Sequence, residues 1–536
     1  MKLSHLSSLT SSARDRTRAG TSLLPWAAVS TVILVGIFFR FYGLSDKLYW
    51  LDEVDFSMRI SGYSLAELRQ ILLAQPVISA EALNSYQFPS DRTVADVLHS
   101  LFLESTDQAP LFYIFTKYWT QLIGGSIATV RAASAVTSLF SFVGIYWLTQ
   151  ELFHSQTVSR IALLLVAVSP IHIIYAQEAR PYSLLIVSIL FSTAILLRAL
   201  KRQTRSWWMA YTLSLIFGIY AHLIFGLAAI AQGLYVLGTA KARSRQSLLS
   251  FLKAGCISLV AFSPWLVMAI RQPSTQTVGF ILDLQWNPLY RLVRVAGILS
   301  RAILDFGTGQ ILSWQIVILS TLLVGCVMLL LAYAVYALVQ QTPRAVWLLP
   351  VMLIVFPAVL LITPDVLIGT QTGTTRYLLP VMLGLQLALA YLLGTQLARA
   401  SRPNRQIWQL LTVIVVACGI FSAGLRTQTV LWWDQLPHIL GEIPADVAYI
   451  NQAQQPLVIV DADRKVNVIF AHVLSHQLAA DRQLIFLAPP YADALPERFS
   501  DIFLFKPSGS LRSNAQQAYE AEAEQLTKFL WKLNPE

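Results

Sequence analysis

The stretch LLPWAAVSTVILVGIFFRFY, residues 23–42, holds one charged residue, Arg40, and is long enough to cross a bilayer as a helix. Ten further apolar runs follow it. Because lipid offers no hydrogen-bond partner to the backbone, such runs span as α-helices. The sequence therefore predicts an all-α polytopic membrane protein with about eleven transmembrane helices. The runs lie near 23–42, 128–152, 160–177, 181–199, 206–222, 223–240, 247–270, 314–339, 345–363, 377–397 and 407–424.

The composition of the 536 residues supports the same class. Hydrophobic residues make up 55% of the chain and charged residues only 13%, with a mean hydropathy of +0.58. A soluble globular chain carries about 25% charged residues. These values exclude a soluble enzyme, a disordered chain and a small disulfide scaffold. The net charge is +10, but many basic residues lie in gaps between apolar runs, as orientation signals do. We therefore expect no nucleic-acid partner.

Four basic gaps predict the orientation of the chain. Basic gaps between spans are typical of the cytoplasmic side. They fall on one side only if residues 110–125 do not cross, so we expect that segment to be a helix lying at the outer interface. The N-terminus is then cytoplasmic and the C-terminus extracytoplasmic. The gaps are the N-terminal segment, Lys201/Arg202/Arg205, Lys241/Arg243/Arg245 and Arg399/Arg402/Arg405.

The predicted organisation has three parts. A cytoplasmic tail covers 1–22, and a transmembrane domain covers 23–424, including a long outer loop at 43–127. From 425 to 536 the character of the chain changes. PLVIVDA (456–462) and QLIFLA (483–488) have the pattern of buried strands, with a helical stretch between them. We therefore expect a small extracytoplasmic α/β domain at 425–536.

The segment YWLDEVDFS, residues 49–57, directly follows the first span and carries three carboxylates, Asp52, Glu53 and Asp55. A carboxylate that is partly desolvated at the membrane surface has a raised pKa and can act as a general base. The same residues could instead form a solvated acidic turn with aromatic interface anchors. The sequence alone leaves both interpretations open.

A second segment, YAQEARPY at 175–182, joins two apolar runs with almost no linker. Glu178, Arg180 and Tyr182 are therefore predicted at the membrane edge, where ionisable groups are costly and indicate function by default. A local Glu–Arg pair that caps the hairpin is the alternative explanation.

Further polar residues are predicted on the outer face. Lys117, Arg131 and Arg376 run against the usual positive-inside trend, and recognition of a phosphate would explain them. Each alone could also be an ordinary helix-end cation. His222 lies between two spans, and Asp107, close to Glu104, forms a second candidate acid site. The chain has no Walker loop, GxGxxG, HExxH or GxSxG motif, so scattered arginines fit a lipid-borne phosphate better than a soluble nucleotide.

Taken in order, these segments resemble the multi-spanning glycosyltransferases of the GT-C fold, specifically glycosyltransferase family 39 and its relatives. Those relatives include protein O-mannosyltransferases and lipid A aminoarabinose transferases. The resemblance covers most of residues 25–400. The segments that carry it are the Asp52-Glu53 pair, APLFYIF at 109–115, Arg131 in VRAASAV, SPIHIIYAQEARPYSLL at 169–185, YAHLIFGL at 220–227, SPWL at 263–266 and RYLLP at 376–380.

The resemblance implies a sugar donor carried on a polyprenyl phosphate. A carboxylate of the first outer loop deprotonates the acceptor hydroxyl, which attacks the anomeric carbon with inversion, and cations stabilise the departing phosphate. Carried over to this chain, Asp52 is the base and Glu53 orients it or the acceptor. The remaining candidates divide into phosphate ligands, Arg131, Arg180, Arg376 and Lys117, and substrate-binding residues, Glu178, Tyr182, His222 and Asp107.

Several features stay open at this stage. The chain has Gln108-Ala109-Pro110 where relatives often have His-Pro-Pro, so no histidine role is assumed there. Asp52 and Glu53 alone are too few ligands to assign a metal, and a divalent cation is left open. The sugar and the acceptor, whether lipid, glycan or protein, are not fixed. The relatives and the lack of cysteine pairs favour a bacterial inner membrane.

Two other classes of function compete with this one. A lipid or solute transporter or flippase would need charged residues at mid-span along a pathway, whereas most ionisable residues here lie at span ends. A non-catalytic lipid-binding protein of the same fold would tolerate the loss of Asp52 and Glu53, and this chain has both. We therefore expect an extracytoplasmic-face glycosyltransferase, with the transporter as the alternative.

Overall fold

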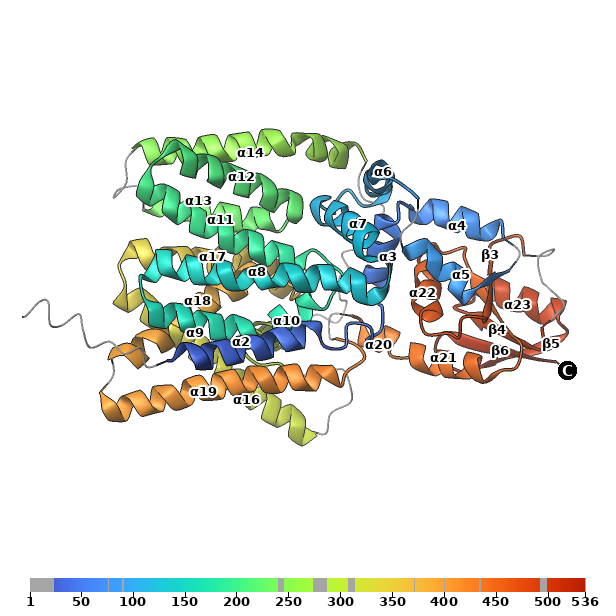
Figure 1. Cartoon of the computed structure of the whole chain (residues 1–536). Helices are drawn as coiled ribbons and strands as arrows, with labels where there is room; N and C mark the ends of the chain where they lie inside the picture. Colours follow the sequence, from blue (N-terminus) through green and yellow to red (C-terminus); the bar gives the residue numbers. More distant parts are fainter. Residues whose placement is uncertain are drawn as a thin grey trace, which may run out of the picture.

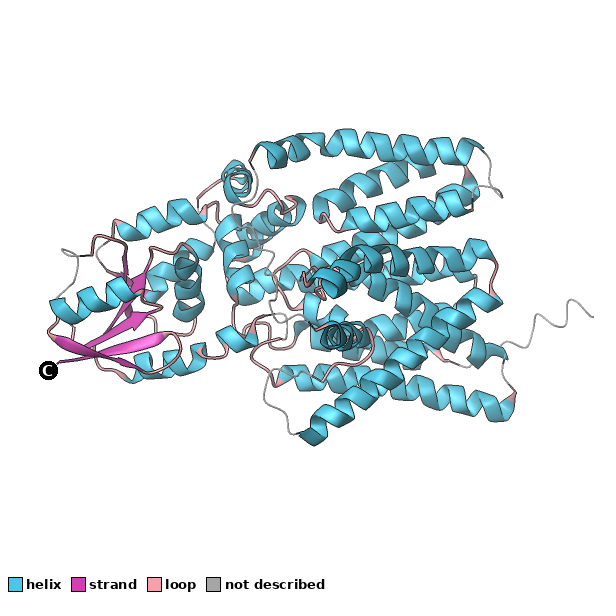
Figure 2. Cartoon of the chain, turned by 180° about the vertical axis from the view of Figure 1, so that it is seen from behind, coloured by secondary structure: helices cyan, strands magenta, loops and turns pink. Residues whose placement is uncertain are grey.

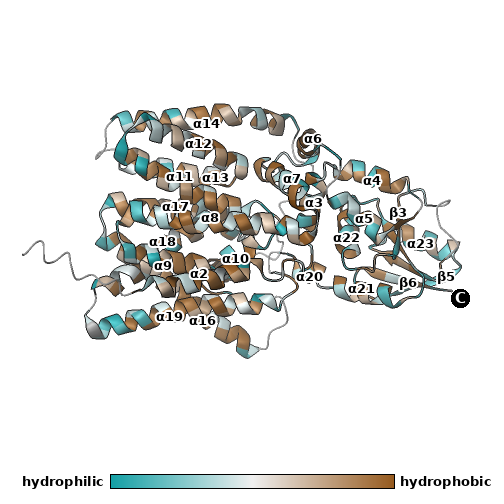
Figure 3. Cartoon of the chain, in the orientation of Figure 1, coloured by the Kyte–Doolittle hydropathy of each residue, from teal (hydrophilic) through white to brown (hydrophobic). Residues whose placement is uncertain are grey.

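The computed structural model describes residues 24–75, 77–88, 91–239, 245–272, 287–306, 314–370, 372–399, 401–432, 435–491 and 499–535. A bundle of long helices lies at one end and a smaller body with a sheet at the other (Figure 1). The strands of the described residues lie in the smaller body (Figure 2). Apolar residues are dense along the bundle helices, as a membrane domain requires (Figure 3). The predicted tail 1–22, Lys241 and Arg243 lie outside the described residues.

Every predicted apolar run is found in a helix of the bundle, and one run falls on a bent pair, α9 and α10. Seven described helices are long and apolar enough to cross a membrane, or eight if the bent pair counts as one span. The other three runs fall on the shorter helices α2, α12 and α13, so the number eleven stays a prediction. The bundle helices are α2 (Trp26–Phe41), α8 (Ile127–Phe153), α9 (Gln156–Val168), α10 (Pro170–Ala176), α11 (Tyr182–Arg202), α12 (Arg205–Ala221), α13 (Phe225–Gly238), α14 (Arg245–Arg271), α15 (Pro288–Ser300), α16 (Trp314–Gln341), α17 (Arg344–Ile368), α18 (Leu379–Arg399) and α19 (Arg402–Thr427).

The bend of 54° between α9 and α10 is caused by Pro170. Proline has no N–H and forces the preceding Ser169 into an extended conformation (ψ 128°). The last carbonyls of α9 therefore lack their helical partners. Arg40 of α2 replaces these partners, because its guanidinium donates to the carbonyl oxygens of Val166 (2.8 Å) and Ala167 (2.9 Å). The break thus directs α10 and the turn after it toward the end of the bundle that carries the smaller body.

Two of the basic gaps lie at the opposite end of the bundle. Gln177 Nε2 donates to the carbonyl oxygens of Phe39 (2.6 Å) and Tyr42 (2.8 Å), which places the start of α11 beside the end of α2. Arg376, just before α18, contacts Asp52 of the first loop. Helices α11 and α18 are each 21 residues long, about 30 Å. Both run away from the end of the bundle at which Asp52 lies. The basic segments that follow α11 and α18 therefore share one end, as predicted, and their cytoplasmic location stays a prediction.

The long loop after α2 folds into short helices packed between the bundle and the sheet (Figure 1). The segment 110–125 is helical, as expected, and α7 packs against α3, α6, α8 and α12. The elements of the loop are α3 (Leu51–Ile60), α4 (Leu65–Leu73), β1 (Ile78–Ser79), α5 (Ala80–Asn84), the 3-10 helix η1 (Ser85–Gln87), α6 (Val94–Glu104) and α7 (Leu111–Ile123).

The tail forms an α/β unit, which confirms the predicted fold class, and both predicted strands and the helix between them are present. The sheet has six strands in the order β1-β3-β2-β4-β6-β5, with β3, β2 and β4 parallel and the other pairs antiparallel. The elements of the tail are α20 (Pro437–Leu440), α21 (Ile443–Gln452), β2 (Pro456–Asp461), α22 (Val466–Ser475), β3 (Gln483–Leu487), β4 (Asp501–Phe505), α23 (Gly509–Ala518), β5 (Ala521–Gln525) and β6 (Leu530–Pro535).

The first loop and the tail share this sheet. Strand β1, from the first loop, pairs antiparallel with β3 of the tail, with Ile78 opposite Leu484. Side chains alternate along β2, because successive residues of a strand point to opposite faces. Val458 and Val460 pack in the same core cluster as the first-loop helices, and Leu457 packs on the other face. The sheet therefore fixes the tail against the loop that carries the first acidic segment.

Candidate active site

Helix α3 carries the acidic segment, with Asp52 and Glu53 in its first turn. Carboxylates are favoured there because the helix dipole and the free N–H groups make a helix N-terminus positive. The helix ends where Gly62 adopts φ +86°, a conformation that glycine reaches without strain. The two carboxylates have different environments. The Asp52 side chain is 30% exposed, whereas the Glu53 side chain is fully buried.

Glu53 is held by Arg131 of α8 in a bidentate ion pair, with Nε–Oε1 at 2.8 Å and Nη2–Oε2 at 2.6 Å. The other three N–H donors of Arg131 bind the carbonyl oxygens of Leu44 (2.7 Å), Lys47 (3.2 Å) and Leu48 (2.9 Å). An arginine has five donors, and all five are therefore taken. The predicted phosphate role of Arg131 does not fit this geometry, since the guanidinium is buried and instead holds Glu53 and the preceding loop.

The turn at 177–181 packs against α3. The backbone N–H of Ala179 donates to Glu53 Oε1 at 2.8 Å, so Glu53 fixes the turn as well as Arg131. Glu178 is buried beside them. Burial raises the pKa of its carboxyl well above the usual value, the Glu53 and Asp52 carboxylates raise it further, and Arg180 opposes the shift. The structure therefore brings both sequence-predicted segments into one site.

Asp52 lies between two arginines that come from the turns before two different membrane helices, α11 and α18. Arg376 Nη1 donates to Asp52 Oδ2 at 2.6 Å, and Arg180 Nη2 lies 3.8 Å from the same oxygen. Arg180 Nη1 also reaches the backbone oxygen of Asp52, at 3.4 Å. Arg180 is 6% exposed, and within the described part of the chain its Nε has no hydrogen-bond partner. A buried guanidinium with unused donor capacity is suited to bind an anion.

The loop that presents Arg376 is organised by a buried carboxylate that sequence reasoning missed. Asp365, near the end of α17, accepts hydrogen bonds from Thr370 Oγ1 (2.7 Å) and Gly373 N (2.8 Å). It also accepts from the backbone N–H of Thr372 at 2.7 Å and from its hydroxyl at 2.9 Å. These contacts fix the backbone that leads to Arg376. An aspartate near a helix end carries no sequence signal that would reveal this role.

A cavity of about 460 Å³ opens onto Asp52. Its walls come from the first loop, from the turns before α11 and α18, and from the start of α22 in the tail. The lining side chains are Leu51, Asp52, Asp55, Leu65, Glu104, Asp107, Gln108, Arg180, Arg376, Tyr377, Lys465, Val466 and Ile469. The tail residues of this set were not predicted, because they lie far from the acidic segment in the sequence and have no motif.

One wall of the cavity is acidic, but its charges are paired. Arg59, fully buried in α3, lies 3.2 Å from Asp55 Oδ1 and 2.8 Å from Glu104 Oε2. Glu104 also accepts from the backbone N–H groups of Leu65 (2.7 Å) and Ala66 (2.9 Å) at the start of α4. Although burial alone would raise it, Arg59 and these N–H groups hold the pKa of Glu104 below its usual value. This wall is therefore a preformed network.

The other predicted residues lie at different distances from Asp52. Asp107 lines the cavity and accepts from Gln108 Nε2 at 2.9 Å. Tyr182 lies behind Arg180, with the guanidinium carbon 5.9 Å from the ring centre, and His222 contacts Tyr182 at 5.6 Å between ring centres. Tyr182 and His222 thus form a layer beneath Arg180 rather than the cavity surface.

Lys117 is separate from this group. It is buried in α7 at 1% exposure and is not among the described residues that line the cavity. Burial lowers the pKa of Lys117, and the carboxylates of Asp96 and Asp91 oppose that shift. The structure therefore does not bring Lys117 to the phosphate site that the sequence predicts for it.

Metal binding has little support among the described residues, where no group of three or more His, Cys, Asp or Glu side chains is placed to hold an ion. Asp52 and Asp55 both line the cavity, but each is close to an arginine. We assign no residue to a metal.

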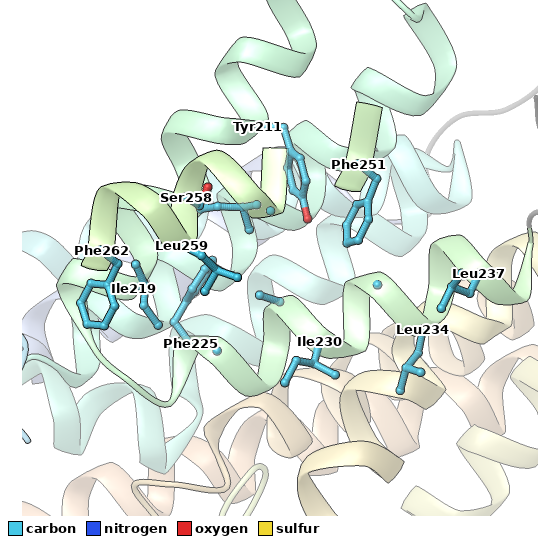
Figure 4. A pocket seen from close by; sticks show the side chains of 15 residues that line it. Tyr211, Ile219, Phe225, Ile230, Leu234, Leu237, Phe251, Ser258, Leu259 and Phe262 are labelled. Carbon is cyan, nitrogen blue, oxygen red and sulfur yellow. The ribbon is translucent and has the colours of Figure 1, made fainter. Parts of the chain in front are cut away.

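A second cavity, of about 390 Å³, lies between α12, α13 and α14 (Figure 4). Apolar side chains such as Ile219, Phe225 and Phe262 make up most of its lining, and no charged residue of the described chain takes part. Ile219 is three residues before His222, so this apolar groove begins close to the layer beneath Arg180. Such a lining suits a hydrocarbon chain.

The sequence and the fold were compared with known protein families and solved structures. Residues 107–268 match the family described as dolichyl-phosphate-mannose-protein mannosyltransferase. The fold matches the crystal structure of ArnT from Cupriavidus metallidurans in the apo state, with a TM-score of 0.50 and 13% sequence identity over 94% of this chain and 97% of that chain. Among curated proteins, no sequence match is found.

Two other solved structures are similar at lower TM-scores. ArnT from Cupriavidus metallidurans bound to undecaprenyl phosphate has a TM-score of 0.47 and 13% identity, over 94% of this chain and 97% of that chain. The Archaeoglobus fulgidus oligosaccharyltransferase, tethered with an acceptor peptide containing the NVT sequon, has a TM-score of 0.48 and 11% identity, over 86% of this chain and 64% of that chain.

The ArnT match covers nearly the whole chain and shows that it has the GT-C fold. The matched segment 107–268 is similar to a mannosyltransferase family, so the sequence resemblance to glycosyltransferases of the GT-C fold is confirmed.

Proposed function

We propose that this protein transfers a sugar from a polyprenyl-phosphate donor to an acceptor hydroxyl on the extracytoplasmic face of a bacterial inner membrane, with inversion at the anomeric carbon. One observation carries the proposal. Asp52, partly exposed in a cavity at the end of the bundle, lies between two arginines, Arg376 and Arg180. This arrangement supports a general base beside two phosphate ligands.

The proposed step moves one proton and one glycosyl group. Asp52 accepts the proton of the acceptor hydroxyl while the oxygen attacks the anomeric carbon of the donor. The bond between that carbon and the phosphate oxygen breaks, and its electron pair stays on the phosphate. Arg180 and Arg376 then stabilise the charge that develops on the leaving phosphate.

The close contact between Arg376 and Asp52 occupies one oxygen of the proposed base. Oδ2 of Asp52 accepts from Arg376 Nη1. A donor phosphate offers Arg376 a second anion, and we propose that the guanidinium then turns toward it and leaves Oδ2 open to the acceptor proton. Donor binding would thereby precede activation of the base.

The donor lipid also needs an apolar surface. The groove between α12, α13 and α14 supplies one (Figure 4), and its residue Ile219 is three positions before His222 of the layer beneath Arg180. We propose that part of the polyprenyl chain lies along this groove while its phosphate meets Arg180 and Arg376. The proposal needs no divalent cation.

The direct test is a transfer assay with purified protein in nanodiscs. A panel of radiolabelled polyprenyl-phosphate sugars serves as donors, native membrane extract serves as acceptor, and NMR of the product gives the anomeric configuration. Label should move from one donor, with inversion. If no donor yields product but labelled lipid moves between leaflets of proteoliposomes, the transporter alternative would replace this proposal.

Replacing Arg180 with glutamine (Arg180→Gln) should weaken donor binding. The substitution removes a buried cation that faces the cavity, and a hydrogen bond to a charged group contributes about 1.5–3 kcal/mol. We expect the KM for the donor to rise about tenfold or more. The matched control is Arg202→Gln, an exposed arginine at the far end of α11, the helix that begins just after Arg180. An unchanged donor KM in Arg180→Gln would remove Arg180 from the phosphate site.

Replacing Asp365 with alanine (Asp365→Ala) should lower the transfer rate without direct contact to the reactants. The variant loses the four hydrogen bonds that fix the loop before Arg376. A displacement of about 1 Å in a positioning residue can cost about 100-fold in rate. We expect a fall of about 10–100-fold, measured in the same assay, with partial retention in Asp365→Asn. Equal activity in both variants and wild type would show that the loop is fixed by other contacts.

A further inference from the structure

The start of α22 forms a wall of the Asp52 cavity. Lys465, Val466 and Ile469 line it, although they belong to the tail and all the other lining residues come from the first loop and the bundle. Helix α22 begins just after β2, at the carboxyl end of a parallel strand, where α/β units usually present their ligand-binding residues. In Figure 1, α22 lies beside α3 and α5.

This wall is firmly attached to the helix that carries Asp52. Helix α22 packs against α3, and Arg69 of α4 donates to the carbonyl oxygen of Ala462 at 2.5 Å, just before α22. At the other end of α22, His476 lies 2.8 Å from Gln87 Oε1 and contacts the ring of Tyr49 edge-on at 5.2 Å. The distance between Lys465 and the reacting centre is therefore set by packing on both sides.

Among the described residues that line the cavity, Lys465 is the cation outside the ion pairs, and Asp107 is the carboxylate outside them. Asp52 is paired with Arg376 and Arg180, the acidic wall is paired with Arg59, and Asp107 accepts from Gln108. The side chain of Lys465 is exposed and makes no hydrogen bond or ion pair with any residue that the structure describes. A lysine ammonium is a compact cation with three donors, so this group is available to an anionic ligand.

The position of Lys465 decides which substrate it meets. Arg180 and Arg376 lie in the turns directly before the membrane helices α11 and α18, which is where the proposed function places the phosphate of the lipid donor. In an inverting displacement the acceptor approaches the anomeric carbon from the face opposite to the leaving phosphate. Lys465 belongs to the domain outside the bundle, so it lies on the acceptor side of Asp52 if the donor phosphate is bound by the two arginines.

We propose that the α22 wall is the acceptor subsite and that Lys465 binds an anionic group, a phosphate or a carboxylate, which the acceptor carries close to its reactive hydroxyl. This inference rests on the proposed function, since it takes the donor phosphate to be bound by Arg180 and Arg376. It gives the tail a role in acceptor choice that is separate from chemistry at Asp52.

The test uses native membrane extract separated by anion exchange into neutral and anionic fractions, each offered as acceptor with the active donor. Wild type should label the anionic fraction. Lys465→Met keeps the length of the side chain and removes its charge. We expect about a tenfold rise in the acceptor concentration for half-maximal transfer, with unchanged donor KM and maximal rate, and a larger rise in Lys465→Glu. Arg464→Met, the exposed neighbour outside the cavity lining, is the matched control.

Further experiments identify the anion and distinguish a failure of the acceptor subsite from a failure of the proposed function. Phosphatase treatment of the anionic fraction should abolish the Lys465 effect if the group is a phosphate, and methyl esterification should abolish it if the group is a carboxylate. Labelling of the neutral fraction, or equal half-saturation in wild type and Lys465→Met, would overturn the inference. If wild type transfers from no donor, the proposed function fails. Equilibrium binding of the radiolabelled anionic fraction to wild type and Lys465→Met then decides the inference alone.

Discussion

Asp52→Asn should reduce the transfer rate by about 10²–10⁴-fold, the contribution typical of a general base. The amide has nearly the same shape as the carboxylate and can still accept a hydrogen bond from Arg376, which lies 2.6 Å from Asp52 Oδ2 in the native protein. It cannot accept the acceptor proton at neutral pH. The loss should therefore appear in kcat, while the donor KM and the unfolding temperature stay close to wild type.

A control separates this loss from a general effect of removing charge near the membrane surface. Asp46 is an exposed aspartate on the same loop and does not line the cavity. Asp46→Asn should keep full activity. Full activity in purified Asp52→Asn, with product of the same anomeric configuration, would remove Asp52 from the role of base and direct attention to Glu178, the buried carboxyl next to it.

Arg131→Met should strongly destabilise the folded protein. It leaves Glu53 fully buried with an unpaired charge and leaves three loop carbonyls without their donor. Breaking a buried ion pair by removing one partner costs about 3–5 kcal/mol. We expect a clear fall in the thermal unfolding midpoint in detergent and a low yield of folded protein.

The double variant Glu53→Gln/Arg131→Met distinguishes a buried pair from a phosphate site. If the cost comes from the uncompensated Glu53 charge, the double variant should regain part of the stability lost in the single variant, because no charge is then buried alone. If Arg131 instead binds the donor phosphate, the single variant should keep wild-type stability and show only a raised donor KM.

Most of the fold follows from sequence periodicity and composition. The apolar runs predict the bundle because only helices satisfy the backbone in lipid, and the two strand patterns of the tail predict its α/β unit. What the sequence does not reveal is that the first loop and the tail form one sheet. Strand β1 is two residues long, and such a short segment has no periodicity to detect; its pairing with β3 depends on tertiary contacts.

The candidate site likewise contains residues that the sequence predicts and residues that it does not. Residues next to apolar runs, such as Asp52, Arg180 and Arg376, could be predicted because a charge at a span end needs a reason, and the structure brings these three together. The family resemblance assigns Asp52 and Glu53 different roles, but their different burial could not be predicted, since adjacent carboxylates look alike in the sequence. Lys465 carried no signal, because its importance comes only from the cavity that α22 helps to close.

The pairing of β1 with β3 also sets an order for biosynthesis. As the chain leaves the ribosome, the loop with Asp52 emerges early, but β3, the strand that β1 pairs with, follows the last helix of the bundle. The loop must therefore wait, without its partner strand, while every later span is inserted. The cavity at Asp52 is completed only when the tail arrives, because Lys465, Val466 and Ile469 of the tail line it.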